Sequence, residues 1–139
     1  MTVKTVSLEF STRGNADIID ITDQIAASIH DTEIANGIVT VFCPSSTSAV
    51  TTIEHENGCF SDLRRLFDEI LDPKREYAHN SRWGDGNGHS HVRAALLGAS
   101  LSVPIVSGRL TLGTWQQIIY IDFDIHPRRR QLVVQVIGE

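Results

Sequence analysis

The chain has 139 residues, of which 41% are hydrophobic and 21% charged, and its formal net charge is −5. This length predicts one domain, residues 1–139, with a core large enough to fold without disulfides or a structural metal. The negative charge argues against a broad nucleic-acid-binding surface, and no stretch approaches the roughly 20 apolar residues that cross a membrane, so we expect neither partner and a location in the cytoplasm.

Strand and helix patterns alternate in the first half of the chain. Residues 4–11 alternate apolar and polar side chains, which is typical of a half-buried strand. Residues 20–37 place isoleucine at every fourth position and predict an amphipathic helix. The β-branched run at 37–44 predicts a buried strand, and a further strand is expected at 49–56. A second helix is expected to follow, with Ser61 as its cap.

The second half predicts one short helix and several strands. Helix formers precede Gly98, so a helix is expected to begin near His89. Trp115 is expected to pack in the core, and the alternative is that its ring is a platform for a ligand. Four strand patterns separated by short turns occupy residues 99–106, 108–113, 115–124 and 130–138. We therefore predict an α+β fold with a largely antiparallel sheet and two or three helices.

Residues 79–98, HNSRWGDGNGHSHVRAALLG, concentrate side chains that bind metals. His89 and His91 are two residues apart, so on an extended segment both imidazoles point to one side. His79 could fold back onto them across the glycine-rich loop, and Asp85 is the nearest carboxylate. Two or three imidazoles with an open position suit zinc or a similar divalent ion. The alternative is that the histidines only hydrogen-bond the loop.

The same segment also suits a phosphate group. A helix that begins near His89 would offer unpaired N–H groups and a favourable dipole to an anion. Arg82 and Arg93 could add bidentate contacts, and the hydroxyls of Ser46 and Thr47 could add neutral donors. A phosphorylated substrate often shares its site with a divalent ion, here Mg²⁺ or Zn²⁺. The alternative is that the glycines only turn the chain.

Three motifs together resemble the YjbQ-like family of small proteins: SSTSAVTTIEHENG, HNSRWGDGNGHSHVRAALLG and GRLTLGTWQQIIYIDFD followed by PRRR. The likeness extends over essentially the whole chain, and some members of the family are assigned as secondary thiamine-phosphate synthases. The resemblance implies an α+β fold that assembles as a homotrimer with sites near subunit boundaries. Gly88 stands where many members have alanine, a change expected to leave the loop intact.

The resemblance also implies a site and a reaction. Carried onto this sequence, the site residues are His79, Asp85, Asn87, His89 and His91, with Arg93 close by and Trp115 and Gln116 from the third motif. The implied reaction joins hydroxymethylpyrimidine diphosphate to a thiazole phosphate and releases pyrophosphate. We expect Arg82 and Arg93 to stabilise the leaving group and one histidine, His89 in the first instance, to transfer a proton.

Two other functions stay open at this stage. One is a metal-dependent hydrolase of a small phosphorylated substrate, in which His79, His89 and His91 hold the ion. The other is a non-catalytic ligand-binding protein.

Overall fold

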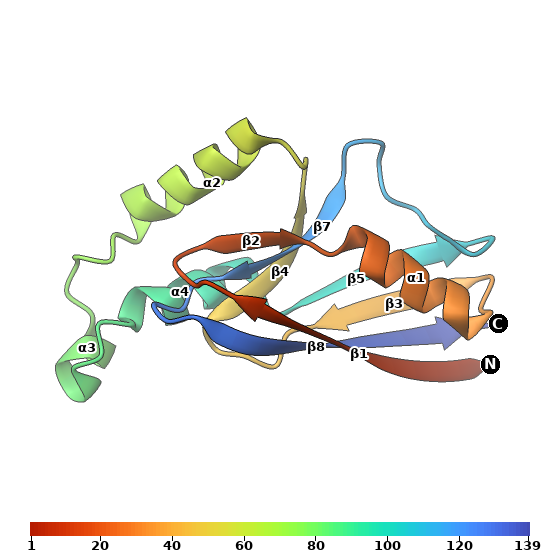
Figure 1. The fold of residues 1–139 in the computed structure, drawn as a ribbon, viewed down its shortest axis with the longest axis horizontal. Helices are drawn as coiled ribbons and strands as arrows, with labels where there is room; N and C mark the ends of the chain where they lie inside the picture. The colour runs from red at the N-terminus through yellow and green to blue at the C-terminus, as the bar shows by residue number, and fades with distance from the viewer.

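The computed structural model describes residues 1–139 and contains two sheets (Figure 1). The larger sheet has the strand order β1 (Thr2–Thr12), β8 (Arg128–Gly138), β3 (Gly37–Phe42), β5 (Ser100–Val106) and β6 (Arg109–Leu110). The smaller sheet has the order β2 (Asp17–Asp20), β7 (Gln117–Asp122) and β4 (Ser48–Ile53). All neighbouring strands are antiparallel. The predicted α+β class with a largely antiparallel sheet is confirmed.

The helices are α1 (Thr22–Thr32), α2 (Asn57–Ile70), α3 (Ala78–Trp83) and α4 (Gly88–Leu97). The sequence predicted two or three, and the additional one is α3, a six-residue helix inside the histidine-rich segment. The α2 helix begins at Asn57, ahead of the expected start at Ser61, because the Glu56 carboxylate accepts hydrogen bonds from the N–H groups of Gly58 and Cys59. No helix combines the length and apolar character that crossing a bilayer requires.

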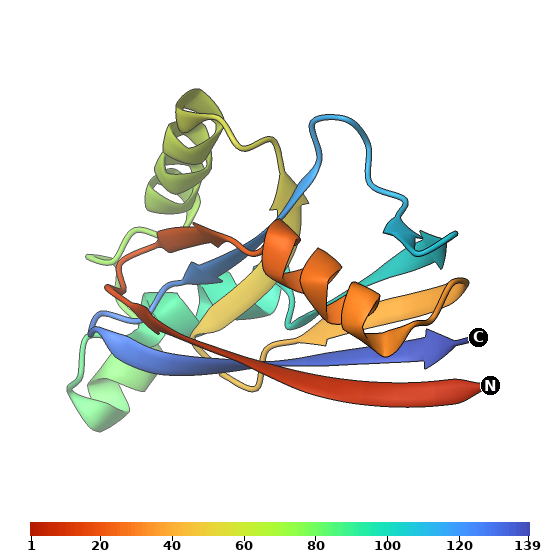
Figure 2. The same ribbon diagram turned by 45° about the vertical axis from the view of Figure 1, so that its right-hand side comes forward.

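The smaller sheet lies between two hydrophobic cores. One face of β7 contributes Ile118 and Tyr120 to the core that α1 shares with the larger sheet, and α1 lies across that sheet in Figure 2. The other face contributes Ile119 and Ile121 to a second core, which α2 and α4 close. A strand buried on both faces is continuously apolar, which explains the uninterrupted run at residues 118–121.

The connection between β6 and β7 lies at the surface. Trp115 is 72% exposed there, so the prediction that it packs in the core is wrong. Gln116 holds the connection to the Ile53 end of β4, since its Nε2 donates to Thr52 Oγ1 at 3.0 Å. The other end of β4, at Ser48, is where buried polar side chains gather.

Candidate functional site

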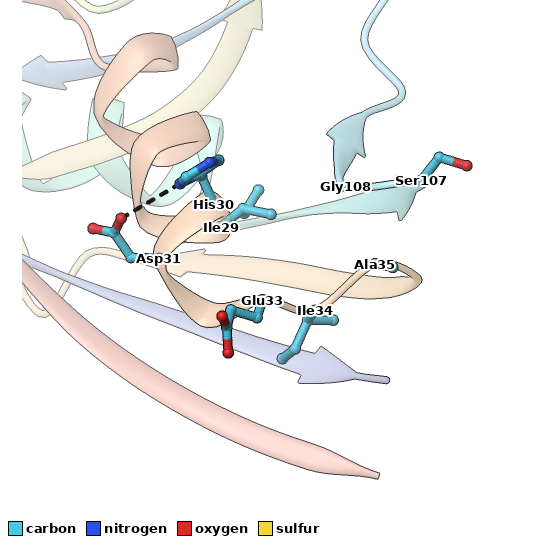
Figure 3. Close-up of a pocket in the computed structure, with 8 residues that line it drawn as sticks. All are labelled: Ile29, His30, Asp31, Glu33, Ile34, Ala35, Ser107 and Gly108. Atoms are coloured by element: carbon cyan, nitrogen blue, oxygen red, sulfur yellow. Dashed lines mark ion pairs between the residues drawn. The ribbon is translucent and has the colours of Figure 1, made fainter.

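The largest hollow, of about 560 Å³, lies where α1 ends beside the turn between β5 and β6 (Figure 3). Its ion pair joins His30 and Asp31, whose side chains are 91% and 82% exposed. All of its polar lining residues are exposed to solvent. A ligand site needs polar groups that are partly removed from water and aimed at one point, so this hollow is not the candidate site.

A second hollow, of about 470 Å³, is polar on nearly every side. We call it the polar pocket and define it by its lining residues Pro44, Ser45, Ser46, Thr47, Asn87, His91, Asp124, Arg128 and Arg130. They come from three separate segments: the connection between β3 and β4, the start of α4, and the chain around the turn from β7 to β8. Apart from Pro44, every one carries a polar side chain. The pocket therefore suits a charged or strongly hydrated ligand.

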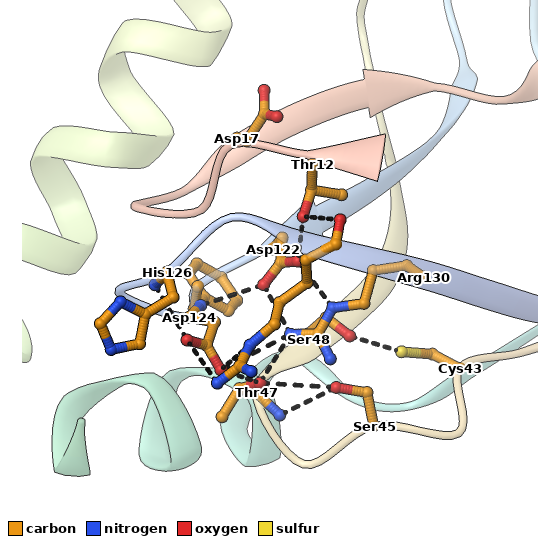
Figure 4. Close-up of polar contacts among 12 residues, drawn as sticks. Thr12, Asp17, Cys43, Ser45, Thr47, Ser48, Asp122, Asp124, His126 and Arg130 are labelled. Carbon is orange, nitrogen blue, oxygen red and sulfur yellow. Dashed lines mark hydrogen bonds and ion pairs between the residues drawn. The ribbon is translucent and has the colours of Figure 1, made fainter. Parts of the chain in front are cut away.

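A buried ion pair forms the base of the polar pocket (Figure 4). The Arg130 guanidinium donates to Asp122 through Nε at 2.7 Å and through Nη2 at 2.9 Å. Asp122 is fully buried and also accepts from Thr12 Oγ1 at 2.5 Å. Arg130 Nη2 donates to Thr47 Oγ1 at 2.8 Å. The hydrogen bonds to Asp122 raise the pKa of Arg130, so the guanidinium stays charged and fixes the position of the Thr47 hydroxyl.

Asp124 links the three segments that line the pocket. Its Oδ2 accepts from Thr47 Oγ1 at 3.0 Å and from Asn87 Nδ2 at 3.4 Å, and Arg128 approaches it at 3.4 Å. Burial acts to raise the pKa of Asp124, but hydrogen bonds from the His126 N–H and from Thr47, together with the charge of Arg128, leave it lowered. Asp124 is therefore a carboxylate at neutral pH, held between two arginines.

The buried thiol of Cys43 lies behind the pocket and is unreactive. Cys43 is 1% exposed, and its Sγ is 2.8 Å from the Ser48 Oγ. Burial raises the pKa of the Cys43 thiol, and because the thiolate is the nucleophilic form, this cysteine is not the reactive group. The hydroxyl of Tyr120 is buried nearby and has no hydrogen-bond partner.

The three histidines of the motif do not converge. His79 and His91 do meet, with ring centroids 4.4 Å apart, and His79 Nδ1 lies 3.2 Å from Asp85 Oδ1. His89 instead lines a separate hollow of about 120 Å³. The prediction assumed an extended segment, but both residues belong to α4, where positions two apart point to nearly opposite sides. Only His91 lines the polar pocket.

His89 and Arg93 face the end of α2 rather than the polar pocket. His89 is 4% exposed, and burial, followed by the charge of Arg93, lowers its pKa. Arg93 donates to the Leu71 carbonyl at 2.8 Å and to Asp68 at 3.0 Å. Its guanidinium therefore ties α4 to the end of α2 and does not line the polar pocket.

Of the other groups expected to contact phosphate, some line the polar pocket and some do not. Ser46 and Thr47 line the polar pocket. Arg82 is exposed and lies over the ring of its neighbour Trp83, 5.4 Å from the ring centroid. The first N–H of α4, that of Gly88, already donates to Asn80 Oδ1 at 2.7 Å. One of the N–H groups at the start of the helix is thus already paired within the protein.

Trp115 and Gln116 are not brought to the histidines within this chain. Gln116 contacts Thr52 near the far end of β4, whereas the polar pocket lies just before its first residue, Ser48. Five steps along a strand separate the two ends of β4 by roughly 17 Å.

The histidine-rich motif does not assemble a protein-held zinc site. No group of three His, Cys, Asp or Glu side chains is placed to hold a metal ion. A catalytic zinc site commonly takes three protein ligands, and His89 faces away from the other two imidazoles. The residues present do not fit the three-histidine ion site that the spacing suggested.

The residues that sequence reasoning missed are Asp122, Asp124, Arg128 and Arg130. Two signals could have found them. Acidic residues at the end of a strand whose central residues, 118–121, are apolar must be paired when buried, and the nearest run of opposite charge, Arg128 to Arg130, starts the next strand along the chain.

Together, these observations describe a small α+β protein with a polar pocket lined by hydroxyl, imidazole and guanidinium groups. The sequence profile of the family described as "UPF0047 protein YjbQ-like" matches residues 6–139. The chain belongs to this family, as the motifs predicted.

Relatives cover nearly the whole chain in sequence and in structure. A UPF0047 protein of Methanothermobacter thermautotrophicus is 37% identical over all of this chain and 95% of its own length. UPF0047 protein YugU of Bacillus subtilis is 33% identical over 95% of this chain and 98% of its own. The crystal structure of a YbjQ-like protein of unknown function from Sulfolobus solfataricus has a TM-score of 0.94, with 34% identity and 99% coverage of both chains.

Proposed function

We propose that the polar pocket binds a small phosphorylated substrate and that the protein is a transferase of the thiamine-phosphate synthase type. In this reaction the thiazole nitrogen of a thiazole phosphate forms a bond to the methylene carbon of hydroxymethylpyrimidine diphosphate. The carbon–oxygen bond to the diphosphate breaks, and pyrophosphate leaves with the electron pair. The observation that carries the proposal is a pocket that joins two arginines and three hydroxyls to one accessible imidazole.

The leaving group needs hydrogen-bond donors and positive charge where negative charge develops. Arg128 is suited to this, because its side chain is 47% exposed and its two contacts with Asp124 are long, at 3.4 Å each. Ser45 and Ser46 add neutral donors from one turn, whereas the hydroxyl hydrogen of Thr47 is already donated to Asp124. Arg130 is committed to Asp122 and has a positioning role, since it holds the Thr47 hydroxyl in place.

His91 is the group we assign to proton transfer, because it is the only histidine in the lining of the polar pocket. An imidazole exchanges protons readily near neutral pH, and His91 would protonate the departing pyrophosphate. His79 packs against the His91 ring and, with Asp85 beside it, restricts where that ring can lie. His89 takes no part in the proposed chemistry.

For the cofactor we propose Mg²⁺ that arrives with the diphosphate rather than zinc held by the protein. Magnesium is commonly bound through substrate phosphates with few protein ligands, which matches a pocket that has no three-ligand cluster. Chelation of the purified protein followed by elemental analysis tests this. Near-stoichiometric zinc that resists chelation would instead favour the hydrolase.

The partner we propose is a second and third copy of the chain, in the homotrimer that the resemblance implies. In such an assembly a neighbouring subunit would supply Trp115 and Gln116 to the polar pocket, which the geometry of one chain does not permit. Light scattering should then give three times the chain mass of 15.4 kDa. A monomeric mass with full activity would contradict the trimer and leave Trp115 and Gln116 without a role.

The reaction is tested by supplying both substrates to the purified protein and measuring thiamine phosphate and pyrophosphate. His91→Ala should lower kcat by about 10²-fold or more, and Arg128→Ala should lower kcat/KM. His30→Ala, an exposed histidine at the hollow of Figure 3, is the matched control and should be neutral. Full turnover by His91→Ala would overturn the catalytic assignment. Binding of substrate by the wild type without any product would favour a non-catalytic ligand-binding protein.

A further inference from the structure

The polar pocket adjoins another hollow, which runs along α4. This hollow has a volume of about 370 Å³, and we call it the α4 groove; its lining residues are Ser45, Ser46, Ser48, His91, Ala94, Ala95, Gly98 and Ala99. It shares Ser45, Ser46 and His91 with the polar pocket. Because the two hollows share these three lining residues, we treat them as one cleft with His91 at the junction.

The two halves of this cleft differ in chemistry. The polar pocket carries two arginines and the buried carboxylate of Asp124. Beyond His91 the α4 groove has no charged lining residue, and its helical wall is made of Ala94, Ala95 and Gly98. Residues with so little side chain leave a shallow, flat surface along the helix. From His91 to Gly98 this wall extends roughly 10 Å at the rise of an α-helix.

A polar group at the wall of the cleft also lacks a partner. Asn87 is 7% exposed, and its Oδ1 accepts no hydrogen bond, although buried polar groups nearly always have a partner. Its Nδ2 donates to Asp124 Oδ2, which fixes the amide with Oδ1 as an acceptor. The Asn87 amide is therefore a buried, fixed part of the wall that lies against Asp124.

We propose that the α4 groove is the subsite for an uncharged, flat group of the substrate, so that the whole cleft takes a phosphate ester of a small planar alcohol. This inference rests on the proposed binding of a phosphoryl group in the polar pocket. The phosphoryl group lies among Arg128 and the hydroxyls, and the flat group lies along Ala95 and Gly98. A length of roughly 10 Å holds one ring and a short linker, whereas a nucleotide with a second ring system would extend beyond Gly98.

Three probes in calorimetric titrations test the subsite on the purified protein: inorganic phosphate, methyl phosphate and benzyl phosphate. Burying one face of a ring removes on the order of 60 Å² from water, so benzyl phosphate should bind about tenfold more tightly than methyl phosphate. Ala95→Leu should abolish that difference, because leucine fills the groove, and leave the Kd for inorganic phosphate within about twofold. Ala95 is exposed and leucine is a good helix former, so this variant should fold.

Leu96→Ala is the matched control, since Leu96 is 63% exposed on the same helix and does not line the groove. It should leave all three affinities unchanged. Equal binding of methyl and benzyl phosphate by the wild type would overturn the subsite while leaving the phosphate pocket intact. An Ala95→Leu variant that weakens inorganic phosphate as much as benzyl phosphate would also overturn it. If no probe binds, the proposed function fails together with the subsite.

Discussion

Replacing Asp122 by asparagine tests whether the buried ion pair at the base of the polar pocket stabilises the fold more than an exposed ion pair does. Asp122 is fully buried, and the Arg130 side chain is 14% exposed. Asparagine has nearly the same shape but no charge, and its Nδ2 would face one of the two donating groups of Arg130. The change therefore leaves a largely buried guanidinium without its ionic partner.

The expected loss is about 3 kcal/mol in the free energy of unfolding. Removing one member of a buried ion pair costs about 3 to 5 kcal/mol, and the remaining amide oxygen, with Asp124 at 3.7 Å from Arg130, recovers part of that. For a chain of this length the melting temperature should fall by roughly 10 °C. The pair Arg129–Glu9 is the control, because its side chains are 69% and 59% exposed. Arg129→Met should cost at most about 0.5 kcal/mol.

Urea denaturation followed by circular dichroism measures these differences, and a double-mutant cycle assigns them to the pair. Arg130→Met alone should be as destabilising as Asp122→Asn, whereas the double variant should lose less than the sum, with a coupling energy of about 2 kcal/mol. If Asp122→Asn and Arg129→Met cost the same, or if the effects of Asp122 and Arg130 are additive, burial does not distinguish this pair and the reasoning fails.

Three further predictions concern the histidine-rich helix. Although many relatives are expected to have alanine at this position, Gly88→Ala in this chain should lower the free energy of unfolding by about 1 to 3 kcal/mol, because its Cβ would lie 2.5 Å from the Cβ of Tyr77, which cannot rotate away. Urea denaturation that matches the wild type would contradict this. Ser90→Ala should cost about 1 to 2 kcal/mol in the same assay, since the buried hydroxyl donates to the Phe123 carbonyl, and a smaller loss would mean that this bond does not anchor α4. Burial lowers the pKa of His89 below its ordinary value of 6.5. Between the folded pKa and pH 6.5 the unfolded chain therefore binds more protons than the folded one. The stabilisation that is present above pH 6.5 is lost as the pH falls through the folded pKa. Thermal melts between pH 7.5 and 5 should show this loss, and His89→Asn should reduce it; an unchanged slope in the variant would assign the effect to another group.

The elements of the fold were largely predictable because their patterns are local. The alternation in β1, the spacing of isoleucines in α1 and the continuous apolar run of β7 each follow from burial on one or both faces. The short β2 was not predicted, because four residues carry too little periodicity. The α3 helix was hidden for the same reason, inside a segment whose glycines and polar side chains read as a loop.

The sequence indicated which segments contribute to the candidate site better than it indicated which residues line the polar pocket. The motif did place His91 and Asn87 at the polar pocket, together with Ser46 and Thr47. The buried Asp122 escaped notice because its partner, Arg130, lies across a turn. Local sequence gives no measure of whether a charge is buried, so a paired interior arginine and an exposed one such as Arg129 look alike.

The largest discrepancy concerns geometry rather than chemistry. Two histidines separated by one residue share a side only if the chain is extended, and the helix formers after Gly88 already predicted that it is not. Once α4 is a helix, His91 must face the polar pocket and His89 must face the end of α2, and the same helix that divides them supplies the wall of the α4 groove. The secondary structure of these ten residues therefore decides both which imidazole can reach a ligand and what lies beside it. If His89→Asn and His91→Ala lost turnover equally, with both proteins fully folded, the two imidazoles would have to act at one centre, and this assignment of faces could not describe the active protein.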